Sequence, residues 1–117
     1  MFTMRNIGVA AIAGVLGCIA NSLAIIAMAG ADPVPLILSA GRQFWSIVFA
    51  MALIPIFFRM SSVTAWITGF VVLDALASLS AVYVWGAGAP WSFVLTVNGA
   101  YALVAVAVYA LGRSRNA

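Results

Sequence analysis

The chain has 117 residues, of which 67% are hydrophobic and only 6% are charged, and its mean hydropathy is +1.23. Soluble domains carry about 25% charged residues, so this composition excludes an ordinary soluble domain and indicates an integral membrane protein. The net charge is +3, but most of the arginines flank apolar segments, and we therefore expect no nucleic-acid partner.

Four apolar segments follow one another along the chain, separated by short stretches of glycine, proline and polar residues. A helix needs about 20 mostly apolar residues to cross a bilayer, and each segment is long enough. The first contains an apolar run of about 22 residues, longer than the about 7–15 of a signal peptide, so we expect a retained helix. We predict an all-α fold with a single domain over residues 1–117, an antiparallel bundle of four transmembrane helices at about 6–29, 35–58, 62–86 and 91–112.

The arginines lie on one side of this predicted bundle. Arg5 precedes the first helix, Arg59 lies between the second and third, and Arg113 and Arg115 follow the fourth, whereas the other two connections contain none. Cytoplasmic loops of membrane proteins are enriched in arginine and lysine. We therefore expect both termini in the cytoplasm, one fixed orientation, and a place in the inner (plasma) membrane of a bacterium.

Each predicted helix carries one strongly polar residue in its outer half: Asn21, Arg42, Asp74 and Asn98. A helix rises about 1.5 Å per residue, so residues at similar distances from the outer ends lie at similar depths. Residues three or four apart share a helix face, which places Ser78 beside Asp74 and Tyr101 beside Asn98. The sequence predicts an intramembrane polar pocket open toward the outer side, formed by Asn21, Arg42, Asp74, Ser78, Asn98 and Tyr101.

The first predicted helix has a face of small residues, formed by Gly14, Gly17, Asn21 and Ala24. Small side chains let two helix backbones approach closely, and this is how helices pack inside a bilayer. We therefore expect a tight bundle in which the first helix contacts its neighbours along this face.

Arg42 and Asp74 are expected to form an ion pair inside the membrane and, if the protein is an enzyme, to be its catalytic residues. A charged residue at the centre of a membrane helix costs roughly 2.5–3.5 kcal/mol, so such residues are usually paired, hydrated or functional. Two alternatives stay open. Arg42 snorkels to the outer interface, or Asp74 is a protonated carboxyl bonded to Ser78 or Asn98 in a cluster that only holds the helices together.

The stretch "SAGRQFWSIVFAMALIPIFFRM", the later "VVLDALAS" and the final helix after a glycine-rich connection resemble the DoxX-like group of small four-helix membrane proteins. In that group a Gly-Ala-Arg-type motif opens the second helix and an aspartate lies in the third. Gly41, Arg42 and Asp74 take the corresponding positions here. Ala40 and Gly41 stand in the reverse order, and Gln43 replaces the acidic residue of the group. The resemblance implies a membrane-embedded subunit or a binder of hydrophobic molecules.

Small multidrug transporters have a similar length and helix count. Their membrane carboxylate, however, is a glutamate in the first helix, and both acidic residues of this chain are aspartates. The one-sided arginines also disagree with the dual topology of those transporters.

Three functions are compatible with these residues. The first is a membrane-embedded subunit or binder of a hydrophobic ligand such as a quinone or lipid. The second is a proton-coupled small-molecule transporter in which Asp74 changes its charge. The third is a small intramembrane enzyme on a lipid-like substrate, with Asp74 as acid or base and Arg42 orienting an oxygen.

We favour the first function and lean against an enzyme, because no nucleophile or dinucleotide motif accompanies the polar residues. The expected partners are the lipid bilayer, a hydrophobic small molecule, and either further copies of the chain in a homo-oligomer or the other subunits of a larger membrane complex. The chain has no histidine and a single cysteine, Cys18, so we expect no metal, no cofactor and no disulfide framework.

Overall fold

The computed structural model describes residues 3–29, 40–84 and 90–113, apart from the side chains at positions 29, 40, 42, 62 and 84. Every element within these ranges is a helix: α1 (Met4–Ala29), α3 (Ala40–Ala50), α4 (Leu53–Arg59), α5 (Ser62–Leu79), the π-helix η1 (Ser80–Val84) and α6 (Trp91–Gly112). The predicted all-α fold is confirmed for this part of the chain. Within the described residues, three helical spans are long and apolar enough to cross a membrane, namely Met4–Met28, Val63–Tyr83 and Trp91–Gly112, which is consistent with membrane integration.

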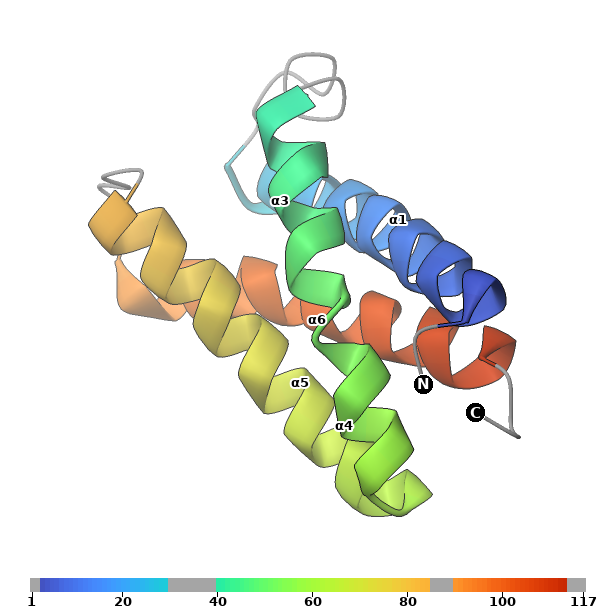
Figure 1. Ribbon diagram of the computed structural model, residues 1–117. Coiled ribbons are helices and arrows are strands. Elements are labelled where there is room, and N and C mark those ends of the chain that lie inside the picture. The colour runs from blue at the N-terminus through green and yellow to red at the C-terminus, as the bar shows by residue number, and fades with distance from the viewer. Residues whose placement is uncertain (1–2, 30–39, 85–89, 114–117) are drawn as a thin grey trace.

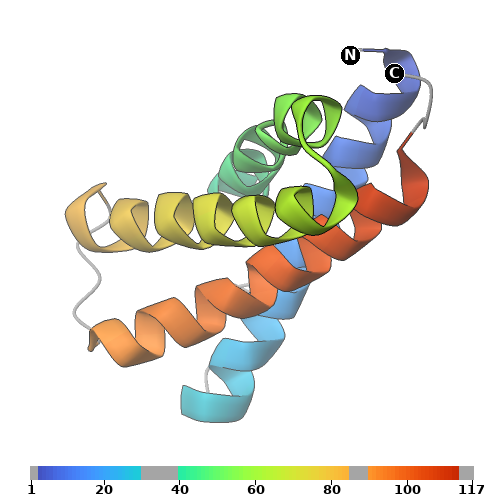
Figure 2. The ribbon, with the colours of Figure 1, turned by 90° about the horizontal axis from the view of Figure 1, so that it is seen from below.

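The helices α1 and α6 pack along each other at the centre of the bundle (Figure 1). They run antiparallel, so the start of α1 and the end of α6 lie together, as Figure 2 shows. The helix α5 packs mainly against α6, and α3 packs mainly against α1. As a result α3 and α5 contact each other only at a few points, and the region between them is bounded by the two central helices.

Two glycines of α1 bring neighbouring backbones into close contact. A Cβ at Gly14 would lie 2.6 Å from the Cα of Ile47 in α3, and a Cβ at Gly17 would lie 2.6 Å from Cδ1 of Tyr101 in α6. Carbon atoms do not approach this closely, so both contacts need a residue without a side chain. The expected close packing along the small-residue face of the first helix is confirmed at these two positions.

The second predicted helix is not continuous. It was expected to run over 35–58, but α3 ends at Ala50 and α4 begins at Leu53, and residues 35–39 lie outside the described ranges. The cause is Pro55, which has no N–H to donate to the carbonyl of Met51 and whose ring crowds that carbonyl. The carbonyl of Met51 instead accepts a hydrogen bond from the N–H of Ile54 at 3.2 Å. The N–H of Ala52 donates to the carbonyl of Phe49 at 3.0 Å. These tighter i→i−3 bonds break the predicted span into two shorter helices.

The other three predicted helices agree with the structure more closely. The first begins two residues earlier than expected, at Met4, and the fourth covers Trp91–Gly112 as predicted. The third was expected to reach residue 86; α5 ends at Leu79, and the chain continues as the π-helix η1 up to the last described position, Val84. A π-helix widens the turn and changes which side chains follow each other on a face.

The half of the bundle around α4 contains a core of buried hydrophobic side chains. Leu53 and Phe57 of α4 are buried together with Val106 and Tyr109 of α6. The rings of Phe57 and Tyr109 meet edge to face, with 5.3 Å between their centroids. Most of the buried polar side chains lie in the other half of the bundle, where α1 ends and α6 begins.

Candidate functional site

A cavity of about 110 Å³, open on one side, lies between α3 and α5. All the long elements contribute to its wall. The lining residues are Cys18 and Asn21 from α1, Trp45, Ser46 and Phe49 from α3, Ala77 from α5, Ser80 and Ala81 from η1, and Asn98 and Tyr101 from α6.

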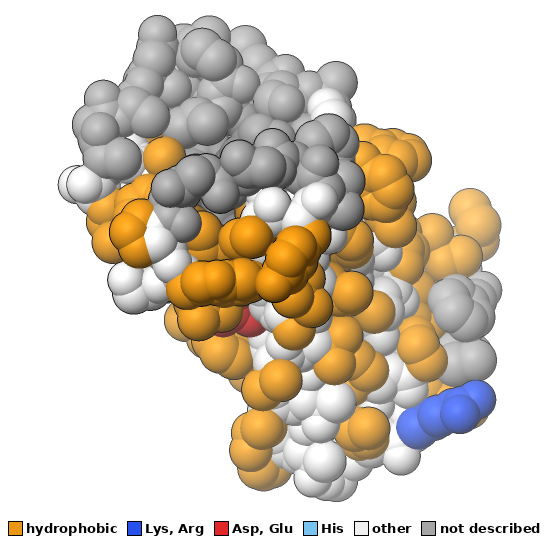
Figure 3. All heavy atoms as spheres, turned by 90° about the vertical axis from the view of Figure 1, so that its left-hand side faces the viewer, with side chains coloured by type: hydrophobic (Ala, Val, Ile, Leu, Met, Phe, Trp, Pro, Cys, Tyr) orange, Lys and Arg blue, Asp and Glu red, His pale blue; other side chains and the backbone are white. Residues whose placement is uncertain are grey.

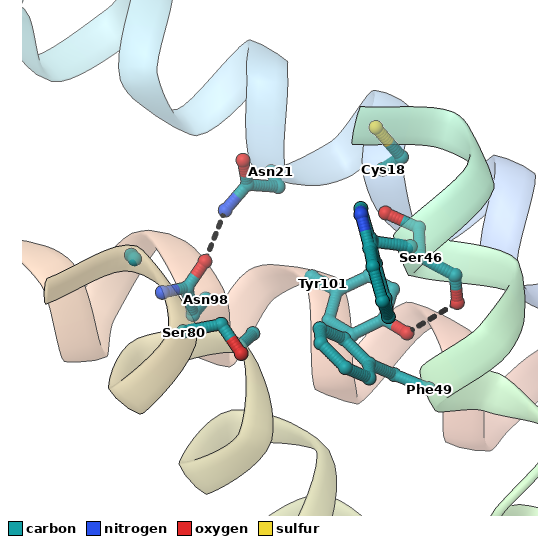
Figure 4. Close-up of a pocket in the computed structure, with 10 residues that line it drawn as sticks. Cys18, Asn21, Ser46, Phe49, Ser80, Asn98 and Tyr101 are labelled. Carbon is teal, nitrogen blue, oxygen red and sulfur yellow. Dashed lines mark hydrogen bonds between the residues drawn. The ribbon is translucent and has the colours of Figure 1, made fainter. Parts of the chain in front are cut away.

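One wall of the cavity is the ring of Tyr101, which is only 2% exposed. Its hydroxyl donates a hydrogen bond of 2.7 Å to the backbone carbonyl of Ser46, and this bond ties α6 to α3 (Figure 4). The ring lies against the backbone of Gly17 on its other neighbour, α1. Tyr101 is therefore fixed in position by two helices and has little freedom to leave the cavity wall.

The opposite wall is formed by two buried amides, Asn21 and Asn98, which are 6% and 9% exposed. The Nδ2 of Asn21 donates to the Oδ1 of Asn98 at 2.8 Å, and the same nitrogen donates to the carbonyl of Val97, also at 2.8 Å. Figure 4 shows the two amides joined at one side of the cavity, with Ser80 close to Asn98. These bonds hold α1 and α6 together at the depth of the cavity.

A chain of hydrogen bonds leads from these amides into α5. The Nδ2 of Asn98 donates to the Oγ of Ser78 at 3.2 Å, and the hydroxyl of Ser78 donates to Oδ1 of Asp74 at 2.9 Å. Ser78 is 1% exposed, so this part of the chain is closed to solvent and lipid. Four side chains from three helices thus form one polar network: Asn21, Asn98, Ser78 and Asp74.

Asp74 ends this network at the seam between α5 and α6, and it does not line the cavity. A Cβ at Gly99 of α6 would lie 3.5 Å from its Oδ2, an ordinary contact distance, so the carboxylate lies beside the backbone of α6 at this position. Asp74 is half-buried, and it is the only acidic residue in the described ranges. Figure 3 shows the acidic atoms as a small patch among hydrophobic side chains. The carboxylate is therefore linked to the cavity but separate from it.

The structure brings together five of the six residues predicted for the polar pocket. Asn21, Asn98 and Tyr101 line the cavity, and Ser78 and Asp74 extend the network away from it. The side chain of the sixth, Arg42, lies outside the described residues, so its expected ion pair with Asp74 stays a prediction. The carboxyl group of Asp74 has a described partner in Ser78, whereas its protonation and a purely structural role stay predictions.

Several lining residues were not selected from the sequence. Trp45 and Phe49 looked like ordinary lipid-facing or core aromatics, because nothing in their spacing separates a cavity wall from a membrane-facing surface. On an ideal helix Ser80 lies about 120° around the axis from Asp74. The rule that residues three or four apart share a face therefore does not place Ser80 beside Asp74. The lining positions Ser46, Ala77 and Ala81 could have been predicted, because each lies on the same helix face as a predicted pocket residue.

The chemistry of the described lining is neutral. Amides and hydroxyls offer hydrogen bonds, and the aromatic rings offer flat apolar contact, but no described lining residue carries a charge. Liquid water takes about 30 Å³ per molecule, and an enclosed cavity of about 150 Å³ binds benzene. This cavity is smaller but partly open, so it accommodates the polar end of a longer molecule whose remainder extends outside it. It suits a neutral carbonyl or hydroxyl compound better than an ion.

No protein-family model, curated protein or solved structure matches the chain. The case for its function therefore depends on the geometry of the cavity and its hydrogen-bond network.

Proposed function

We propose that the protein is a small integral membrane protein that binds the polar end of a hydrophobic molecule, such as a quinone or a lipid, in the cavity between α3 and α5. The observation that carries this proposal is a cavity with neutral hydrogen-bonding groups on one wall and aromatic rings on the other, inside a bundle whose long helices suit a bilayer. Hydrophobic ligands with one polar end need this combination, because a carbonyl or hydroxyl transferred into hydrocarbon loses its hydrogen bonds to water.

The ligand would enter from the membrane. Because α3 and α5 contact each other at few points, the tail of a bound molecule can lie in the hydrocarbon between them while its polar end occupies the cavity. The small volume supports this arrangement, since pockets that enclose a complete drug-sized ligand measure about 300–1,000 Å³.

The orientation is part of the proposal. The one-sided arginines support cytoplasmic termini, and the cavity then lies in the outer half of the bilayer. The same orientation is compatible with the inner membrane of a bacterium, which we include in the proposal. The resemblance to the DoxX-like group supports the same class of function, a membrane-embedded subunit or a homo-oligomeric binder.

The natural probe of the cavity is Trp45, which lines it. In a variant whose other tryptophans, Trp66, Trp85 and Trp91, are changed to phenylalanine, its fluorescence reports occupancy of the cavity. We expect a short-chain benzoquinone, or a monoacylglycerol carrying bromine near its headgroup, to quench this fluorescence saturably. Quenching that grows in proportion to the probe in the bilayer, without saturation, would contradict the proposal.

A matched pair of substitutions on one helical segment completes this experiment. Ala81→Phe fills the cavity, whereas Ala75→Phe adds the same side chain to an exposed position of α5 that does not line it. We expect saturable quenching to disappear in the first variant and to persist in the second. Equal behaviour of the two variants would show that the probe binds elsewhere.

A second function, coupled to protons, is favoured by the hydrogen-bond network. A ligand that bonds to Asn21 or Asn98 shares a continuous chain of hydrogen bonds with Asp74, so its binding and the charge of that carboxyl are able to influence each other. This supports a proton-coupled transporter in which Asp74 gains and loses a proton. An enzyme that uses Asp74 as acid or base is supported less, because the carboxylate does not line the cavity.

A further inference from the structure

Two arginines are held at the corner where α1 begins and α6 ends. The Nε of Arg5 donates a hydrogen bond of 3.0 Å to the carbonyl of Gly112, the last residue of α6. Arg113 follows Gly112 directly, and its Nη1 donates a hydrogen bond of 3.1 Å to the carbonyl of Phe57 in α4. Through these contacts the end of α6 is tied to the start of α1 and to Phe57 of α4, and Figure 1 shows the start of α1 close to the end of α6.

Close helix packing fixes this arrangement. A Cβ at Gly112 would lie 2.9 Å from Cγ1 of Val9, so α1 and α6 touch next to the arginine contact. The guanidinium of Arg113 also lies over the ring of Phe57, 5.1 Å from its centroid. Both side chains are thus held by backbone carbonyls and a ring, and their positions do not depend on an acidic partner.

The positive charge at this corner has no described acidic neighbour. The chain has only two acidic residues, Asp32 and Asp74. Asp74 bonds to Ser78 in the other half of the bundle. Asp32 is outside the described residues and follows the far end of α1, so nearly the whole length of that helix separates it from Arg5 along the chain. Within the described residues, no acidic side chain therefore compensates the charge at this corner.

We propose that Arg5 and Arg113 bind the phosphate of an anionic phospholipid. A guanidinium has five N–H donors, and each of these two makes only one hydrogen bond with a described residue. The planar fork of arginine matches the oxygens of a phosphate better than the ammonium of lysine does. Exposed apolar side chains flank the site, with Met4 at 89% and Leu111 at 83% exposure, and they offer contact for an acyl chain.

This inference is independent of the cavity. It requires only that the helices lie in a membrane and that this end of the bundle reaches the headgroup region, where juxtamembrane arginines meet anionic lipids. Loss of the lipid site would leave the proposed ligand cavity untouched, and the reverse also holds.

The test is native mass spectrometry of the full chain released from bilayers that contain phosphatidylglycerol and phosphatidylcholine in equal amounts. We expect the protein to retain phosphatidylglycerol preferentially. Arg5→Gln and Arg113→Gln should each lower this preference about threefold or more, because each removes a charge-assisted fork. Arg59→Gln is the matched control: it removes the same charge from the exposed end of α4 and should leave the preference unchanged.

Three results would overturn the proposal: equal retention of both lipids by the unchanged protein, equal loss in the Arg59→Gln control, or displacement of the lipid by excess inorganic phosphate. An equal loss in the Arg59→Gln control would mean that net charge alone attracts the lipid. Displacement of the lipid by inorganic phosphate would mean that the site binds free phosphate. If a glutamine variant loses helicity by circular dichroism, Arg5→Lys and Arg113→Lys replace it. They keep the charge and lose the fork, and an unaltered preference in both would equally refute a guanidinium site.

Discussion

The hydroxyl of Ser78 donates a hydrogen bond to Asp74 one helical turn earlier, over 2.9 Å. The same oxygen accepts an N–H from Nδ2 of Asn98 in α6 at 3.2 Å, so its single proton is committed to the carboxylate and one of its two lone pairs to the amide. This fixes the direction of the whole network, in which each donor points toward Asp74. The carboxylate is the final acceptor of a chain that begins at Asn21 in α1.

Asn98→Leu should destabilise the protein by about 1–3 kcal/mol, because it removes two interhelical hydrogen bonds that are worth roughly 0.6–1.7 kcal/mol each inside a membrane. Reversible unfolding in mixed micelles, followed by circular dichroism, measures the effect. Thr96→Val is the control on the same helix, since the Thr96 hydroxyl is exposed and bonds only to the carbonyl of Ser92. A change below about 0.5 kcal/mol is expected there. Equal effects of the two substitutions would contradict a structural role for the network.

Asp74→Asn should separate the candidate functions, because it keeps the shape of the side chain and removes its charge. A binder keeps saturable quenching of Trp45 with at most a modest loss of affinity. A proton-coupled transporter still binds ligand but no longer accumulates it in proteoliposomes, and an enzyme stays folded without turnover. Loss of quenching together with retained fold would instead place Asp74 in the ligand site itself.

The same substitution tests the expected ion pair with Arg42. If the pair exists, Arg42→Ala destabilises the protein more than Asp74→Asn does, since it leaves a carboxylate in the membrane without its cation. Unfolding free energies of the two variants decide the point. Small and equal changes would show that Arg42 and Asp74 do not depend on each other.

Gly14→Ala should weaken the packing of α3 on α1 by about 1–3 kcal/mol, because the new Cβ would meet the backbone of Ile47, which cannot turn away as a side chain can. Gly8→Ala is the matched control, as nothing lies within 4 Å of a Cβ at that position. There the change should be neutral or stabilising by up to about 1 kcal/mol, the difference in helix propensity. Unfolding midpoints of the two variants provide the comparison, and a stable Gly14→Ala variant would contradict the described α1–α3 contact.

Pro55→Ala should lengthen the helix across the break between α3 and α4, since alanine restores an N–H that can reach the carbonyl of Met51. Spin labels at the exposed positions Val48 and Phe58 would report the change as a distance by electron paramagnetic resonance. We expect that distance to shift and its distribution to narrow as the two helices align. An unchanged distance would assign the break to tertiary packing rather than to the proline.

The parts of the fold that could be predicted are those that depend on counting along the chain. The rise of a helix per residue is constant, so the depth of a residue follows from its distance to the helix end. Asn21 and Asn98 have similar depths on antiparallel helices, which predicts that they lie close together. The face rule likewise placed Ser78 next to Asp74. Both rules use only the backbone geometry of an ideal helix.

The parts that could not be predicted depend on departures from that geometry or on neighbours. The break at Met51 arises because Pro55 removes one hydrogen bond, yet proline is tolerated in many membrane helices, so its presence alone does not locate a break. The cavity wall at Trp45 exists because α3 diverges from α5. No pattern within either segment encodes that divergence.

The break at Met51 also means that α3 and α4 are held by different contacts. The short rod α4 is locked in place by Phe57, which packs on Tyr109 and carries the guanidinium of Arg113. The helix α3, in contrast, is attached to α1 at Gly14 and to α6 through the Tyr101–Ser46 bond. The interruption at Met51 thus divides one predicted span into a segment that borders the cavity and a segment that belongs to the hydrophobic core, and each is held by its own set of contacts.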